Sequence, residues 1–128
     1  MRRALAGLLA VGALTITSGS VIAHHSFAMF DSDNQIELAG VVQEFKFTNP
    51  HTFILLMVKE EDGATQTWNL EGMSPSALVR EGWSSKTIKA GDELKMKIAP
   101  LRSGAPGGAW YTNQINFRDG TPILTVSH

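Results

Sequence analysis

The chain has 128 residues, of which 43% are hydrophobic and 18% are charged, a composition typical of one globular domain. It contains no cysteine, which excludes disulfides, thiolate nucleophiles and cysteine-ligated zinc or iron–sulfur centres. The formal net charge of −1 provides no basic field for nucleic acid or for an anionic membrane surface.

Residues 1–23 have the pattern of a secretory signal peptide. Arg2 and Arg3 precede an uncharged, mostly apolar run, and small residues then lead to Ala23. The apolar run is shorter than the roughly 20 residues that a membrane-spanning helix needs. We therefore expect cleavage after Ala23, no stable membrane insertion afterwards, and a periplasmic or secreted single domain at residues 24–128.

The first half of this domain predicts three strands, at residues 36–48, 52–59 and 65–70. In the first strand Val41, Phe45 and Phe47 share one parity, which predicts one buried face, and Gly40 suggests a bend or bulge. The second strand is apolar on both parities, so we expect it to be covered on both faces. The sequence Asp62-Gly63 then favours a tight hairpin turn.

The second half predicts one helix and further strands. Ser74 can cap a helix that starts with Pro75 and ends at Gly82. Strands are expected at residues 93–98 and 109–117, with a flexible loop at residues 104–108 and a last edge strand at residues 122–126. Three strands, a helix and two or three strands predict an all-β domain, a small OB-like Greek-key barrel. An open β-sandwich is the alternative.

The histidines are the residues that suggest a binding site, for a metal ion. Cleavage after Ala23 would make His24 the N-terminal residue, with an α-amine and an imidazole in one chelate, and His25 adds a second imidazole. His51 follows Asn49-Pro50 at the connection between two predicted strands, where a stiff turn would hold it in place. A nitrogen-rich site without thiolates suits Cu(II). Each histidine also has a structural alternative: a frayed terminus for the pair, and a corner residue for His51.

Other polarisable side chains have simpler interpretations. Met57 and Met96 lie in apolar strands and are expected in the core, whereas Met29 is kept as a possible copper ligand because it is close to the histidines. His128, the last residue, would contribute only if the two termini meet. The three tryptophans could form a stacking platform, but packing in the core is the simpler interpretation; they are Trp68, Trp83 and Trp110.

Several short motifs resemble an uncharacterised family of small secreted bacterial proteins. They are the His24–Phe27 start after the signal peptide, Thr48–Thr52, the stretch Glu71–Trp83 and Gly91-Asp92. The resemblance implies one compact β-domain with an OB-like course. It brings no activity and no catalytic residue, but His24, His25 and His51 are among its most recognisable positions.

The function predicted first is periplasmic binding of a late transition metal, copper first, through His24, His25 and His51, for storage or delivery. The second interpretation is an interaction module that holds a saccharide, a peptide or a periplasmic partner protein without metal, on a face with Trp110 and Tyr111. The third is a copper-dependent oxidase with N-terminal histidine ligation. We expect no nucleic-acid partner and no catalytic residue.

Overall fold

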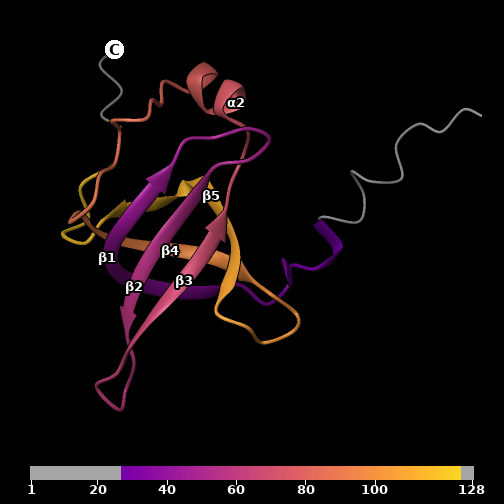
Figure 1. Cartoon of the computed structure of the whole chain (residues 1–128), viewed down its shortest axis with the longest axis vertical. Helices are drawn as coiled ribbons and strands as arrows, with labels where there is room; N and C mark the ends of the chain where they lie inside the picture. Colours follow the sequence, from indigo (N-terminus) through magenta and orange to yellow (C-terminus); the bar gives the residue numbers. More distant parts are fainter. Residues whose placement is uncertain (1–26, 125–128) are drawn as a thin grey trace, which may run out of the picture.

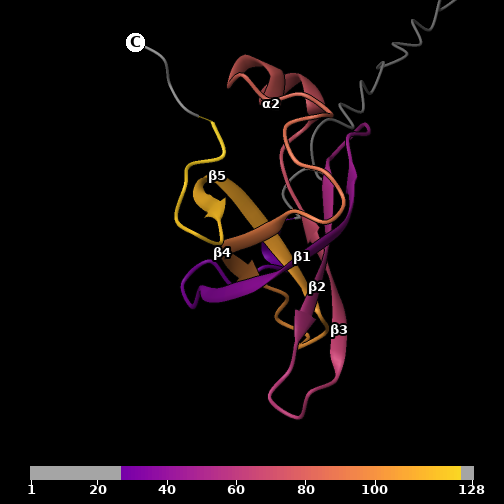
Figure 2. The ribbon, with the colours of Figure 1, turned by 90° about the vertical axis from the view of Figure 1, so that its left-hand side faces the viewer.

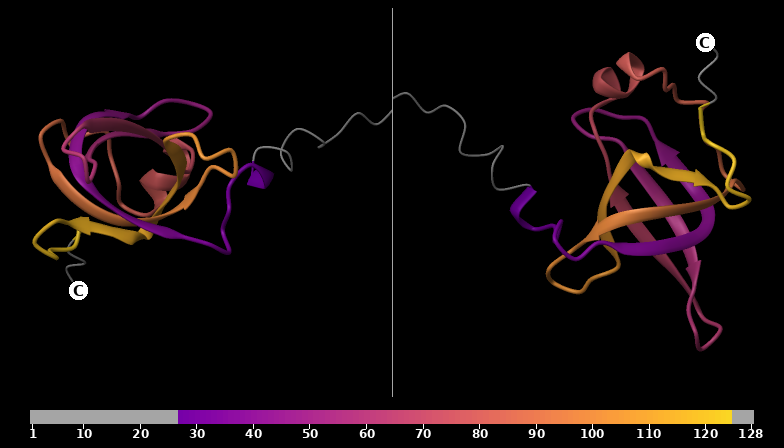
Figure 3. Two further views of the ribbon diagram at one scale, coloured as in Figure 1. Left: turned by 90° about the horizontal axis from the view of Figure 1, so that it is seen from below. Right: turned by 180° about the vertical axis from the view of Figure 1, so that it is seen from behind.

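The structure, a computed structural model, describes residues 27–124 and is a closed five-stranded barrel (Figures 1 and 3). The elements in chain order are β1 (Ile36–Lys46), β2 (Phe53–Lys59), β3 (Thr65–Glu71), α2 (Pro75–Arg80), β4 (Glu93–Pro100) and β5 (Gly107–Phe117). The strands pair in the order β1-β2-β3-β5-β4, and β4 closes the ring onto β1. The pairing is antiparallel except between β3 and β5, which run parallel.

This arrangement confirms the small OB-like Greek-key barrel and makes the open β-sandwich alternative wrong. Helix α2 connects β3 to β4 and lies at one end of the barrel, whereas the β2–β3 hairpin projects beyond the opposite end (Figure 2). None of the helices within residues 27–124 combines the length and the apolar character needed to cross a membrane. The predicted signal peptide and His24, His25 and His128 lie outside the described residues.

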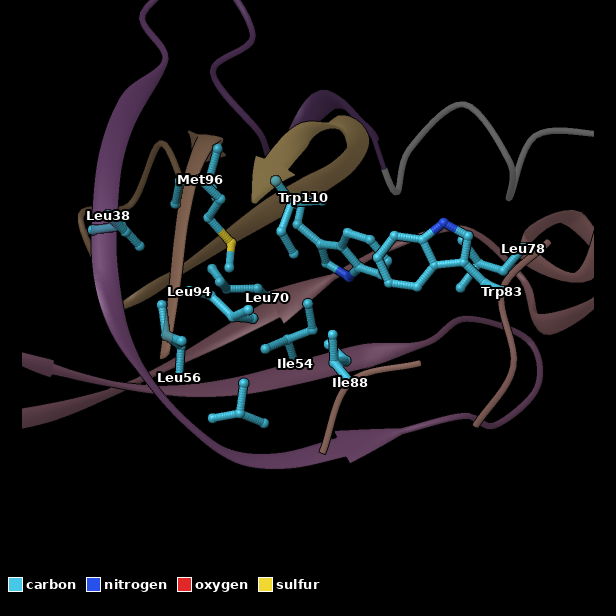
Figure 4. Packing of buried hydrophobic residues seen from close by; sticks show 13 residues of the cluster. Leu38, Ile54, Leu56, Leu70, Leu78, Trp83, Ile88, Leu94, Met96 and Trp110 are labelled. Atoms are coloured by element: carbon cyan, nitrogen blue, oxygen red, sulfur yellow. The ribbon is translucent and has the colours of Figure 1, made fainter. Parts of the chain in front are cut away.

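The barrel interior holds the main hydrophobic core, in which inward residues of all five strands meet Leu78 of α2 and Trp83 (Figure 4). The fully buried members include Ile54, Leu56, Leu70, Leu78, Leu94 and Ile98. Only one parity of β2 is fully buried, because a single-layer barrel has one interior. The expectation that β2 is covered on both faces is therefore wrong, since Phe53 and Leu55 stay partly exposed.

For the first half of β1, the sequence predicted the wrong face to be buried. Val42 is 1% exposed, whereas Val41 is only partly buried. The β1–β2 register shifts between Val42 and Glu44, so that Phe45 packs against the core on the opposite parity. Gly40 is not at the bulge, because the register shift lies between Val42 and Glu44. A Cβ at Gly40 would lie 2.4 Å from the Met57 carbonyl oxygen. Glycine at this position permits a close approach of two strands.

Helix α2 is shorter than predicted but begins as the sequence indicates. The Ser74 side chain accepts a hydrogen bond from the Ala77 amide at 3.3 Å, and Pro75 occupies the first turn. The β5 strand begins at Gly107, so part of the predicted flexible loop belongs to the sheet. The predicted edge strand is not formed over residues 122–124, where Pro122 makes an isolated bridge; residues 125 and 126 lie outside the described part of the chain.

Candidate functional site

A pocket of about 290 Å³ lies at the end of the barrel where β3 ends and α2 begins. It is also bordered by the β1–β2 connection, by the start of β5 and by the N-terminal segment, defined here as residues 27–31. Most of its wall is apolar, and its residues are Phe27, Phe30, His51, Glu71, Gly72, Met73, Ser74, Ala77, Ala109, Trp110 and Tyr111. The candidate site is therefore assembled from four separate stretches of the chain.

The polar end of the pocket is a histidine–carboxylate pair. The β2–β3 register places Glu71 opposite Phe53, two residues after His51, and His51 Nδ1 contacts a carboxylate oxygen of Glu71. The side chains are 33% and 23% exposed, so the pair lies at the pocket mouth rather than in bulk solvent. Since Nδ1 faces the Glu71 carboxylate, Nε2 is the imidazole nitrogen that remains available to a metal ion.

Backbone hydrogen bonds fix the position of His51. The preceding Asn49–Pro50 peptide is cis, and the following residue, Thr52, is fully buried. The Thr52 amide and hydroxyl both donate to the Met73 carbonyl, at 3.1 and 2.8 Å, and the Gly72 amide donates to the Thr52 carbonyl at 2.8 Å. These three bonds extend the β2–β3 pairing beyond the strands. As a result, the backbone next to His51 is held against Gly72 and Met73.

Hydrogen bonds of Arg102 and of the backbone attach the N-terminal segment to the end of β4 and the β4–β5 connection, and the Asp31 amide donates to the Pro100 carbonyl at 2.8 Å. The Arg102 amide donates to the Met29 carbonyl at 2.9 Å, and its Nε donates to the Ala28 carbonyl at 3.1 Å. The Arg102 guanidinium also lies 3.6 Å from the Asp31 carboxylate. Phe30 is 5% exposed and forms a bridge with Leu101. These contacts hold the segment where Phe27 and Phe30 reach the pocket.

Trp110 joins the pocket to the core. Its indole lies against Gly72, where an added Cβ would meet Nε1 and Cε2 at 2.3 Å. The ring centroid is 5.3 Å from that of Trp83 and 6.3 Å from that of Phe45, so three aromatic rings pack together. Trp110 is 2% exposed. It is therefore a packing residue, as is Trp83, and the interpretation as an exposed stacking platform is wrong for both.

The neighbours of Asp31 stabilise the ionised form of its carboxyl group. The side-chain hydrogen bond from Asn34, and then the nearby Arg102 guanidinium, lower the pKa of Asp31 below its ordinary value of 3.8. Asp31 is therefore ionised at neutral pH and maintains its attraction to Arg102.

Of the three predicted metal ligands, the structure places His51 in this pocket, and His24 and His25 lie outside residues 27–124. Within those residues no group of three or more histidine, aspartate or glutamate side chains could hold a metal ion. Sequence reasoning missed Glu71 and Arg102. It also kept Met29, which does not line the pocket, and did not keep Met73, which does.

Comparison with known protein families gives the relationship of the chain. A model of a family of unknown function, DUF6152, matches residues 13–111. The chain belongs to this family. The match confirms the resemblance noted in the sequence, and it covers the N-terminal segment, His51, Glu71 and Arg102. DUF6152 is a family of unknown function, so membership assigns no activity to the pocket. The comparison with curated proteins gave no match.

Proposed function

We propose that the protein binds copper in the periplasm through His24, His25 and His51, and that it stores or delivers the metal. The observation that carries the proposal is that Phe27 and His51 line the same pocket. Phe27 follows His24 by three positions, and an extended chain spans at most about 3.6 Å per residue. Covalent geometry therefore keeps the α-carbon of His24 within about 11 Å of that of Phe27.

The chemistry of the pocket mouth supports a metal ligand at His51. Metal-binding imidazoles commonly donate their second N–H to a carboxylate, which fixes the ring and raises its basicity. Glu71 occupies that position against Nδ1 of His51. With the α-amine and imidazole of His24, the donor set would be rich in nitrogen and free of thiolate, which favours Cu(II) among the divalent ions.

The attachment by Arg102 supports the same proposal. A terminal chelate contributes to a site on the barrel only if the chain that carries it is held nearby, since ordering a free segment costs about 1–2 kcal/mol per residue. The hydrogen bonds of Arg102 hold Ala28 and Met29 in place. These residues follow His24 and His25 closely in sequence. Less entropy then remains to be lost on binding.

The test is titration of the processed protein with Cu(II), followed by electron paramagnetic resonance and a competing chelator. We expect one site per chain with nitrogen ligation, provided that mass spectrometry confirms the N-terminus at His24. His51→Ala or His24→Ala should lower the affinity by at least about tenfold, and Glu71→Gln by about 10- to 100-fold.

His128→Ala is the matched control, because it removes an imidazole that the proposal does not use. It should leave the copper affinity of the processed protein unchanged. Absence of a stoichiometric site, or a site that survives both His24→Ala and His51→Ala, would contradict the proposal.

One observation favours a second candidate, a metal-independent interaction module. The pocket wall is largely apolar, and a cavity of about 290 Å³ fits one large apolar side chain of a peptide or partner protein. Trp110 is buried, so on the face proposed for a saccharide Tyr111 is the partly exposed aromatic side chain. If a periplasmic partner binds His51→Ala and the unsubstituted protein equally in the presence of a chelator, this candidate replaces the copper proposal.

A further inference from the structure

Met73 is an exposed methionine in a place where packing does not require one. Its exposure is 37%, whereas Met96 in the core is 2% exposed. A thioether at a partly exposed position is available as a soft ligand. Met29 is also exposed, at 45%, but only Met73 lines the pocket that contains His51.

The backbone holds Met73 beside His51. Thr52 follows His51 directly, and both its amide and its hydroxyl donate to the Met73 carbonyl. In the opposite direction, the Gly72 amide donates to the Thr52 carbonyl. Because Thr52 is fully buried, these bonds are protected from competition with water. These hydrogen bonds hold the backbone at His51 and the backbone at Met73 together, and both residues line the pocket.

We propose that His51 Nε2 and Met73 Sδ bind the metal as Cu(I), a proposal that rests on the copper-binding function above. Thioether sulfur selects Cu(I) over Cu(II), whereas imidazole accepts either ion. Binding requires no redox step at this site, since the ion enters in its reduced state. Cu(II) is expected to combine His51 with the nitrogen-rich N-terminal chelate, so the two oxidation states share His51 and differ in their other ligands.

The electrostatics of the pocket favour a singly charged ion. The cost of moving an ion out of water increases with the square of its charge, and the wall of the pocket includes apolar groups such as Phe30 and Ala77. Glu71 supplies one negative charge against His51. Among the residues that line this pocket, the single carboxylate balances the whole charge of Cu(I) and half of the charge of Cu(II).

The first test is competition titration of the processed protein with a chromophoric Cu(I) chelator under anaerobic conditions. Met73→Leu keeps the size and the apolar character of the side chain but removes the sulfur. We expect it to lower Cu(I) affinity by about tenfold or more, the order of effect seen when a supporting metal-site group is lost, while Cu(II) affinity stays unchanged. Met29→Leu, the matched control, should leave both affinities unchanged.

The outcomes separate the two proposals. If Cu(II) binds as expected and Met73→Leu leaves Cu(I) affinity unchanged, the Cu(I) assignment is wrong and the copper-binding function stands. If neither ion binds the unsubstituted protein, both proposals fail.

A second measurement does not depend on a substitution. In protein labelled with ¹³C at the methionine methyl groups, Ag(I) serves as a redox-inert probe for a thioether site. We expect Ag(I) to shift the Met73 methyl resonance and to leave that of the buried Met96 unchanged. A shift of the Met29 resonance without one at Met73 would overturn the assignment.

Discussion

Gly72→Ala should destabilise the barrel, because the added methyl group would enter the indole of Trp110. Its Cβ would lie 2.3 Å from Nε1 and Cε2, and ordinary van der Waals contact begins at 3.4 Å, so one of the two groups must move by about 1 Å. The flexible end of a side chain could move away, but Trp110 is packed against Trp83 and Phe45. Overpacking of this kind costs about 1–3 kcal/mol.

A double-mutant cycle identifies the cause. Equilibrium unfolding in urea gives the free energy of unfolding of the unsubstituted protein, of Gly72→Ala, of Trp110→Phe and of the double variant. Since phenylalanine lacks the second ring of the indole, the cost of Gly72→Ala should fall to less than half in the Trp110→Phe background. Equal costs in the two backgrounds, or a cost below about 0.5 kcal/mol, would refute the contact as its origin.

Two other predictions concern contacts that hold the site. Thr52→Val removes the hydroxyl that donates to the Met73 carbonyl and should lower the free energy of unfolding in urea by about 0.5–1.5 kcal/mol; an unchanged value would contradict its role. Asp31→Asn should destabilise the protein at neutral pH, and this destabilisation should decrease as the pH falls below 3.8. The folded-state pKa of Asp31 is lowered below 3.8, so its contribution is present above that pH and is lost as pH falls through the lowered pKa. A destabilisation that persists in acid would show that charge is not the cause.

The order of the elements follows from local signals in the sequence. The Asp62-Gly63 turn, the Ser74-Pro75 cap and the alternation of Leu94, Met96 and Ile98 depend only on neighbours within a few residues. Three strands, a helix and two strands then leave few ways to close a small barrel. The face of β1 is different, because its bulge is a property of the pairing with β2. The alternation of apolar and polar residues along β1 alone does not reveal where its pairing with β2 shifts by one residue.

The hairpin turn alone does not predict the histidine–carboxylate pair. A two-residue turn at Asp62-Gly63 would pair Ile54 with Glu71, whereas the longer connection, with Glu60 hydrogen-bonded to Ala64, pairs Phe53 with Glu71. This difference of one residue in register is a property of the folded hairpin. Arg102 had no signal in the sequence. Its hydrogen bond to Ala28 spans 74 positions in sequence, and such a contact exists only after the barrel has closed.

The tripeptide Glu71–Met73 makes stability and ligand binding depend on the same backbone. Glu71 orients His51, Gly72 leaves room for Trp110, and the Met73 carbonyl accepts both hydrogen bonds of Thr52. A shift of about 1 Å at Gly72 therefore changes the core and the pocket together. Sites whose ligands must be held to within about 0.5 Å are sensitive to such shifts. Under the copper proposal, Gly72→Ala should consequently weaken copper binding even in molecules that remain folded, which a core substitution far from the tripeptide would not do.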